Sequence, residues 1–239
     1  MNRLTTLRTS STILSLAILS LAACSSGAIK NEAPSPAAQI TGLNPRQPRI
    51  TDERILSDRR TIDAVQLRLR KLNAGIAQNS YPLAKAQCWL DTAASQYFEN
   101  DRTGYVEESL TEAVKIAQAL EADKSARAGF DTPLVARSSL LRNDLWVQLN
   151  TYKNQPATLS CNARTVACAE VRLVRAGHAN EQTGWRQATP WVQMAEDGLV
   201  KAKAEADKCV PTAQLPESAF IAAATPVAPG GVSVPAASK

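Results

Sequence analysis

The sequence predicts an all-α fold: a helical bundle of about five to six helices, built from helical hairpins and flanked by disordered tails. Three observations predict it. Between residues 50 and 209, apolar residues recur every three or four positions, which is the spacing of one helix face. Proline, glycine and asparagine interrupt these stretches where helices would end. Residues 24–49 and 210–239 are rich in proline and alanine without this periodicity, and we expect a flexible tether and a disordered tail.

The first two helices are predicted from their stripes and start signals. Thr51 or Asp52 can cap the first, whose apolar stripe is Ile55, Ile62, Val65, Leu69, Leu72 and Ile76. Pro82 suits the first turn of the second, because its fixed φ matches a helix and its missing N–H is not needed there. The stripe of this second helix is Leu83, Ala86, Leu90, Ala94 and Tyr97.

A third helix follows the turn at residues 100–104 and runs to about Ala122. Glu107 and Glu108 fall in its first turn, where the helix dipole favours acids. With Glu112 they are expected to form a solvated face. Residues 123–141 are predicted to be a long loop with a turn or two of helix, because glycine and proline interrupt the pattern there.

Three further helices complete the predicted domain. Asn143 is expected to cap a short helix at 144–152, which Asn154-Gln155-Pro156 ends. The last two helices are predicted at 163–180 and 185–208. A run of apolar residues at 220–224 could form one helical turn within the tail.

Two segments match at an offset of 80 residues. Both follow the pattern Cys-x11-Asn-x2-Thr-Gly-aromatic, beginning at Cys88 and at Cys168 and ending at Tyr105 and Trp185. One interpretation is chance combined with common turn chemistry. The other is a duplicated helical hairpin, in which each glycine turns the chain and each aromatic opens the next helix.

The N-terminus has the order of a bacterial signal peptide. Arg3 and Arg8 precede an apolar stretch that is too short for a comfortable membrane span. Leu21-Ala22-Ala23-Cys24 then resembles a lipobox, which implies that residues 1–23 are removed and that Cys24 is lipidated, with palmitate among the acyl chains. The alternative is an ordinary leader, cleaved after Ala23, that leaves a free thiol. Ser25 favours the outer membrane, since an Asp there retains enterobacterial lipoproteins in the inner membrane.

Four further cysteines lie in the predicted helical domain: Cys88, Cys161, Cys168 and Cys209. An even number in an oxidising compartment predicts two disulfide bonds. We favour a local Cys161–Cys168 bond and a long-range Cys88–Cys209 bond. If the 80-residue repeat is real, Cys88 and Cys168 occupy equivalent places, and a Cys88–Cys168 bond competes, with Cys161–Cys209 as the other.

Several functions are not favoured by the sequence. The formal net charge of +5 partly reflects the leader, and the basic residues at 54–71 alternate with acids, so no nucleic-acid site is predicted. His178 is the only histidine, and the cysteine spacing does not suit a metal, so we predict no metal site and no cofactor. No nucleophile motif or phosphate loop is present, and we predict that the chain is not an enzyme.

The four tryptophans are Trp89, Trp146, Trp185 and Trp191. Most are expected in the core. A groove lined by Trp185 and Trp191 is the remaining candidate binding site.

Two groups of residues carry a family resemblance. The first is the segment from Pro82 to Asp91 with Tyr97, and the second includes Ala167-Cys168-Ala169-Glu170 and Pro190-Trp191-Val192-Gln193. They resemble the helical lipoprotein region that precedes the peptidoglycan-binding domain of some OmpA-like proteins. That domain itself has no counterpart in this sequence, so peptidoglycan binding is not implied.

We therefore expect a lipoprotein of the cell envelope, anchored in the outer membrane and facing the periplasm. Its contact with the membrane would be the N-terminal lipid, and its helical module would bind an envelope protein or support a larger assembly. The alternative is a peptidoglycan- or glycan-associated protein, and an envelope enzyme is less favoured.

Overall fold

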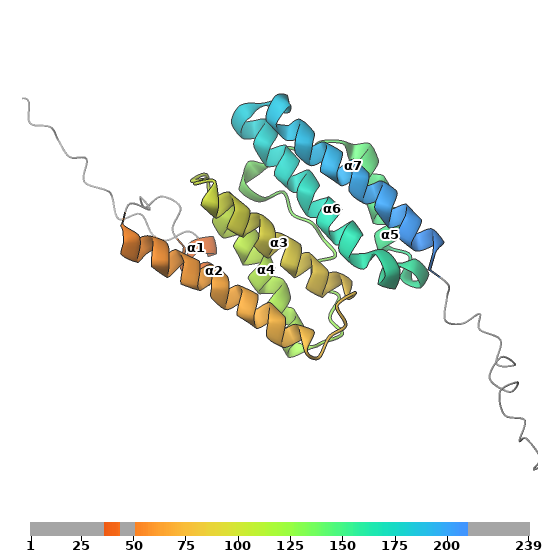
Figure 1. Cartoon of the computed structure of the whole chain (residues 1–239), viewed down its shortest axis with the longest axis horizontal. Coiled ribbons are helices and arrows are strands. Elements are labelled where there is room, and N and C mark those ends of the chain that lie inside the picture. The colour runs from red at the N-terminus through yellow and green to blue at the C-terminus, as the bar shows by residue number, and fades with distance from the viewer. Residues whose placement is uncertain (1–35, 44–50, 210–239) are drawn as a thin grey trace, which may run out of the picture. The chain divides into compact units, whose positions relative to one another are not determined.

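The computed structural model describes residues 36–43 and 51–209, and within these ranges the chain forms helices and no strand (Figure 1). The all-α prediction is confirmed. The helices are α1 (Pro36–Thr41), α2 (Asp52–Asn73), α3 (Tyr81–Phe98), α4 (Tyr105–Ala122), the short 3-10 helix η1 (Val135–Arg137), α5 (Asn143–Lys153), α6 (Pro156–Thr183) and α7 (Trp185–Asp207). None of them is both long enough and apolar enough to cross a membrane.

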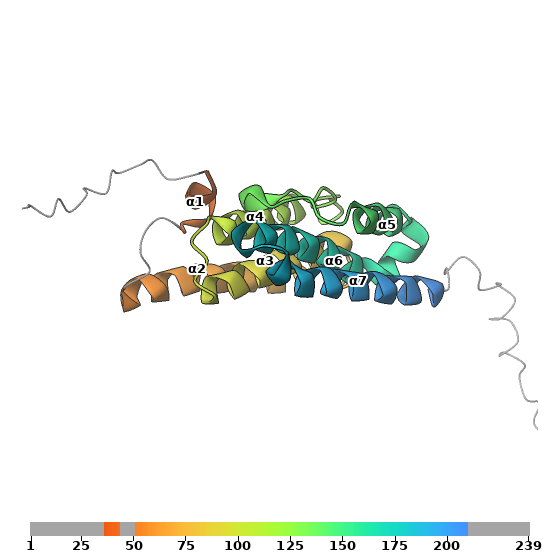
Figure 2. The same ribbon diagram turned by 90° about the horizontal axis from the view of Figure 1, so that it is seen from above.

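Two helical hairpins form the centre of the fold. Helices α3 and α4 make one, α6 and α7 make the other, and α3 packs directly on α6 (Figure 1). The helix that precedes each hairpin in the chain packs against it: α2 packs on α3 and α4, and α5 packs on α6 and α7. Seen from above, α4 and α5 lie in one layer and α2 and α7 in the other (Figure 2).

The disulfide bonds follow this arrangement. Cys88 of α3 is bonded to Cys168 of α6, with 5.3 Å between their Cα atoms. These are the two cysteines that match in the 80-residue repeat. Cys161 is bonded to Cys209, which ties the start of α6 to the end of α7.

The favoured pairing of Cys161 with Cys168 and of Cys88 with Cys209 is wrong. Helix α6 begins at Pro156, seven residues earlier than predicted, so Cys161 and Cys168 both lie within it. Two turns of helix separate them by about 10 Å, which is too far for a disulfide bond. Pro156 opens α6 and does not merely end the helix before it, because proline suits the first helical position.

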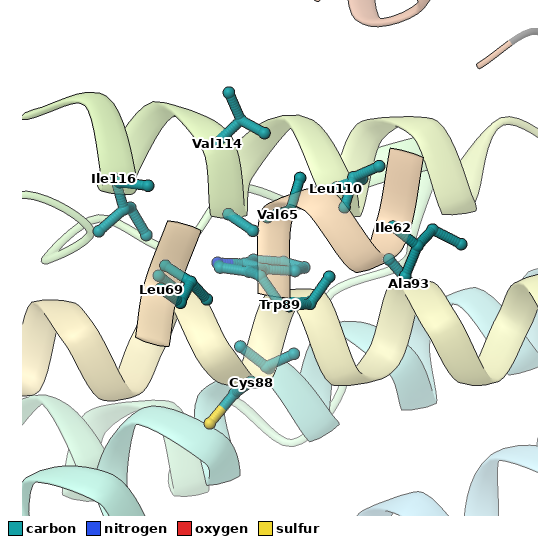
Figure 3. Packing of buried hydrophobic residues seen from close by; sticks show 14 of the residues in the cluster. Ile62, Val65, Leu69, Cys88, Trp89, Ala93, Leu110, Val114 and Ile116 are labelled. Atoms are coloured by element: carbon teal, nitrogen blue, oxygen red, sulfur yellow. The ribbon is translucent and has the colours of Figure 1, made fainter. Parts of the chain in front are cut away.

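The first core lies between α2, α3 and α4. The indole of Trp89 is fully buried and is surrounded by side chains of α2 and α4, among them Val65, Leu69 and Leu110 (Figure 3). The predicted stripe of the first helix supplies its buried positions, and Thr51 caps that helix by accepting a hydrogen bond from the N–H of Arg54. The periodicity identified the apolar part of this core, Ile62 to Leu72, whereas Ile76 of the predicted stripe lies beyond the end of α2 and the buried Asp58 was not predicted.

The second core lies between α5, α6 and α7. Leu149, Val166 and Leu173 are fully buried there, and the small residues Ala195 and Ala202 of α7 let the helices approach closely. Trp146 packs against both cores and donates a hydrogen bond from its indole N–H to the carbonyl of Leu141.

Asn143 does not cap α5. The helix begins at Asn143, and the cap position is held by Arg142 in the left-handed region, with a φ of 52°. The guanidinium of Arg142 pairs with Asp144 of α5 and with Glu196 of α7. Arg142 therefore joins two helices, and these ion pairs hold it in a conformation that a non-glycine residue adopts rarely.

The segment expected to be a tether contains α1, which packs on α4. Leu43, just after α1, is almost completely buried in the first core. The expectation of a solvated acidic face on α4 is wrong for Glu107, which is 1% exposed. The reason is that Glu107 lies on the part of α4 that α1 approaches.

The loop at 123–141 contains the single turn η1, as predicted, and it runs close over α6. A Cβ atom added to Gly177 would lie 2.0 Å from the carbonyl oxygen of Ser139. Glycine at this position therefore lets the loop reach the helix, and the hydroxyl of Ser139 donates a hydrogen bond to the carbonyl of Gly177.

Other predictions fall outside the described residues. They concern the leader at 1–23, Cys24, the rest of the tether, and the tail at 210–239 with its apolar run at 220–224.

Candidate functional site

The turns of the two hairpins lie at the same end of the fold, because α3 and α6 run in the same direction. Contacts such as Asp101 with His178 and Glu99 with Arg175 join the two helix ends. Gly104 and Gly184 turn the chain with φ angles of 96° and 88°, a region that glycine enters without steric cost. The two turns differ in detail, because Thr103 lies in the loop after α3, whereas α6, predicted to end at residue 180, continues to Thr183.

A polar cavity of about 860 Å³ opens between these turns. This volume lies in the range of small-molecule sites. Its lining combines buried side chains (Gln96, Asp101, Arg175 and His178) with exposed ones at the rim (Arg102, Arg137, Glu181 and Gln182, among others).

His178 is held in the wall of the cavity by Asp101. The imidazole Nε2 lies 2.7 Å from Oδ2 of Asp101, and both side chains are almost completely buried. The ring of Tyr105 stacks on the imidazole with 4.2 Å between ring centres. The other oxygen of Asp101 accepts hydrogen bonds from the hydroxyl and the backbone N–H of Thr103, at 2.6 and 2.8 Å.

These hydrogen bonds keep Asp101 ionised. Burial alone would raise the pKa of its carboxyl group, but the hydrogen bonds from His178 and Thr103 outweigh burial and lower the pKa to about 2. A charged acceptor at Nε2 fixes the orientation of the imidazole ring. The imidazole Nε2 is already paired with Asp101, so it is not free to take a proton from a molecule in the cavity as a general base must.

Arg175 is the buried cation of the cavity. Its Nη2 donates to the carboxylate of Glu99 at 3.2 Å, and its guanidinium carbon lies 5.0 Å from the ring centre of Trp191 and 5.7 Å from that of Tyr105. Contacts of this kind between a guanidinium group and aromatic rings are attractive and restrict the long side chain. Arg175 is thus held in a fixed place with part of its hydrogen-bonding capacity unused.

The loop brings strained backbone to the same cavity. Ala136 and Arg137 both have positive φ, at 50° and 56°. The carboxylate of Glu108 accepts a hydrogen bond of 2.6 Å from the N–H of Ala136 and so holds this conformation. Strain of this kind is found at functional sites, and here it places Arg137 at the rim.

Trp185 and Trp191, which were expected to line a binding groove, do not line this cavity. Trp185 is 53% exposed, and Trp191 is half-buried against Arg175; neither lines the cavity. Trp191 contributes indirectly, because it holds Arg175. Sequence reasoning missed the pair of Asp101 and His178, although Asp101 and the other residues of that turn lie within the repeated pattern.

A second cluster of charges is sealed inside the fold. The Nζ atom of Lys85 lies 2.6 Å from both the carboxylate of Glu170 and the hydroxyl of Thr132, and 3.2 Å from the hydroxyl of Tyr81. Lys153 reaches the other oxygen of Glu170 at 2.9 Å. The carboxylate of Glu170 in α6 therefore binds α3 and α5 through the two lysines, and the same lysines donate to Thr132 and to the carbonyl of Phe130 in the long loop.

The surroundings of this cluster set its protonation. Burial lowers the pKa of Lys85 to about 8, against the opposing effect of Glu170, so the ammonium stays charged at neutral pH. Burial would raise the pKa of Glu170, but the charges of Lys85 and Lys153 outweigh it and the pKa falls below its usual value. This cluster joins the helices and is closed to solvent, so we assign it a structural role.

Acid is expected to destabilise the fold through Asp101 and Glu170. The folded-state pKa of each lies below its value in the unfolded chain. Each carboxylate therefore contributes stability above the unfolded pKa of about 4, and this contribution is lost as the pH falls through the folded pKa, about 2 for Asp101. Urea unfolding between pH 7 and pH 2 measures the effect. Asp101→Asn should flatten the curve below pH 4, and an unchanged slope would contradict this account.

Within residues 36–43 and 51–209, no three histidine, cysteine or acidic side chains come together as a metal site would require. Comparison with protein-family models, with curated proteins and with solved structures finds no match for the chain.

Proposed function

We propose that this chain is a lipoprotein of the bacterial cell envelope, anchored in the outer membrane through Cys24 and facing the periplasm. Its helical domain would be a non-enzymatic module that binds an envelope protein or supports an assembly, like the helical lipoprotein region of OmpA-like proteins that the sequence resembles. The observation that carries the proposal is the sequence Leu21-Ala22-Ala23-Cys24 after a basic and then apolar leader.

The cysteine pairing supports this compartment. The two disulfides account for four of the five cysteines, and the fifth is Cys24 of the lipobox. Disulfides that join core helices form and persist in oxidising compartments such as the periplasm. Two or three acyl chains at Cys24 would hold the protein durably at a membrane, whereas one would not.

The geometry also supports a binding role. The two hairpins lie side by side, with α2 and α7 in one outer layer (Figure 2), and stacked helical hairpins use such outer helices to bind partners. The buried position of His178 and the closed cluster around Lys85 favour structural roles for the groups that could otherwise transfer protons.

Cys24→Ser is expected to release the protein from the membrane fraction into the soluble periplasm, because the thiol that carries the lipid is removed. Fractionation of cells, together with labelling by a palmitate analogue, measures both the location and the acylation. Ser26→Ala, two residues away, is the matched control and should keep both. If Cys24→Ser remains bound to membranes, the anchor is not the proposed lipid.

A second candidate is association with peptidoglycan or another glycan, and the exposure of Trp185 favours it. More than half of this large aromatic surface is accessible at the start of α7, and aromatic faces pack well on sugars. Purified cell-wall sacculi should then retain the protein, and Trp185→Ala should abolish retention while Val200→Ala, at another exposed apolar residue of α7, should not. Equal retention of both variants would argue against this candidate.

A further inference from the structure

The cavity between the hairpin turns contains hydrogen-bond donors that nothing in the described part of the chain satisfies. Nε2 of Gln96 and both Nε and Nη1 of Arg175 have no hydrogen-bond partner, and the two side chains are more than nine-tenths buried. Buried polar groups are nearly always paired, and each unpaired one costs about 1 to 3 kcal/mol. Donors left open in the wall of a cavity indicate an acceptor that the protein does not supply.

The acids in the cavity are already engaged. Glu99 accepts from Arg175, and Asp101 accepts from His178 and Thr103. At the rim, Arg137 is exposed and makes no ion pair within residues 36–43 and 51–209, and Arg102 donates only to the side chain of Asn100. Apart from Nδ1 of His178, which also has no hydrogen-bond partner, the unused capacity among the described side chains of the cavity is that of donors and cations.

The balance of charge limits what can bind. Three arginines line the cavity, Arg102, Arg137 and Arg175, and so do three acids, Glu99, Asp101 and Glu181. A doubly charged phosphate would meet these acids with nothing to offset its second charge. A single carboxylate needs only a guanidinium group and a few N–H donors, and arginine matches its geometry well.

We propose that this cavity binds a small organic molecule through a single carboxylate group. Arg175 is the anchor, Gln96 is a second donor, and Arg137 contacts the ligand from the rim. This ligand goes beyond the proposed function, which consists of a lipid at Cys24 and binding to an envelope protein. Binding of the carboxylate does not depend on lipidation of Cys24.

His178 and Asp101 serve as positioning residues. Asp101 orients the imidazole, the imidazole stacks on Tyr105, and Tyr105 with Trp191 holds the guanidinium of Arg175. Asp101 and His178 thus fix the position of the Arg175 guanidinium group. The strained backbone at 136–137 does the same for Arg137.

The test uses NMR titration of the isotope-labelled protein with its disulfides intact. The probe is N-acetylalanine, which carries one carboxylate, and the matched probe is N-acetylalanine amide, which has the same shape without the charge. We expect saturable shifts of the side-chain N–H signals of Arg175 and Gln96 with the acid and none with the amide. Equal shifts with the amide, tighter binding of inorganic phosphate, or no saturable shift would each overturn the proposal.

Variants separate binding from folding. Arg175→Lys keeps the charge but loses the planar fork, and Arg137→Gln removes a rim charge from an exposed position. Each should weaken binding of N-acetylalanine roughly tenfold or more, as expected for a lost hydrogen bond to a charged group. Arg60→Gln, at an exposed position of α2 away from the cavity, should bind like the wild type. If Arg137→Gln is folded and binds with unchanged affinity, the assignment of the rim is wrong.

Discussion

Glu170→Ala is expected to lower the free energy of unfolding by about 3 to 5 kcal/mol, which is the typical cost of removing one partner from a buried ion pair. The change leaves the ammonium group of Lys85, which is fully buried, without its carboxylate, and it removes the acceptor of Lys153. Urea unfolding at pH 7 measures the loss. The loss of stability arises mainly from the unpaired ammonium charge of Lys85 and less from the lost attraction between Lys85 and Glu170.

Two further variants test this explanation. Lys85→Met combined with Glu170→Leu replaces the innermost pair by apolar groups of similar volume, and it should recover most of the stability, since such replacements are often neutral or better. Glu196→Ala removes a partly exposed partner of Arg142 and should cost less than about 1 kcal/mol. If the double variant is as unstable as Glu170→Ala, the explanation from uncompensated charge is wrong.

The second large effect concerns the disulfide between the hairpins. Replacing both Cys88 and Cys168 by alanine should lower the free energy of unfolding by about 4 to 5 kcal/mol, because this bond closes a long loop and its loss returns that entropy to the unfolded chain. Denaturant unfolding of the purified variant measures the change. Both cysteines also contact the first core, so the alanines lose some packing there.

Hydrogen exchange distinguishes this bond from the other one. Cys161 and Cys209 join the ends of α6 and α7, and Cys161 is exposed, so replacing this pair by serine should raise exchange mainly in the last turn of α7 and the first turn of α6. Replacing Cys88 and Cys168 should raise exchange where α3 packs on α6. The same exchange pattern in both variants would contradict this division of roles.

The sequence allowed the fold to be predicted where local rules decide it. The buried apolar residues of α2, the cap at Thr51 and the proline at the start of α3 depend only on neighbours along the chain, and each is found where it was expected. The boundary of α6 was missed because Pro156 both follows one helix and opens the next. Because the start of α6 was placed too late, a bond between Cys161 and Cys168 was favoured. The 80-residue repeat had suggested the correct bond between Cys88 and Cys168 as the alternative.

The cavity and the buried charges could not be predicted in this way. His178 meets Asp101 across 77 positions, and Lys85 meets Glu170 across 85. Such pairs depend on the register between α3 and α6, which no local pattern encodes. Lys85 lies outside the predicted apolar stripe of its helix, and only the packing of the two hairpins shows that it is fully buried.

The bond between Cys88 and Cys168 also determines how the domain would carry mechanical load. In a protein held at Cys24, a pull from the membrane enters the domain through α2, α3 and α4. A partner bound to α7 would pull on the other three helices. The covalent bond joins the two halves at their central helices, so the force passes through it and bypasses the long loop at 123–141. We therefore expect α3 and α6 to stay joined at Cys88 and Cys168 when the two halves are pulled in opposite directions.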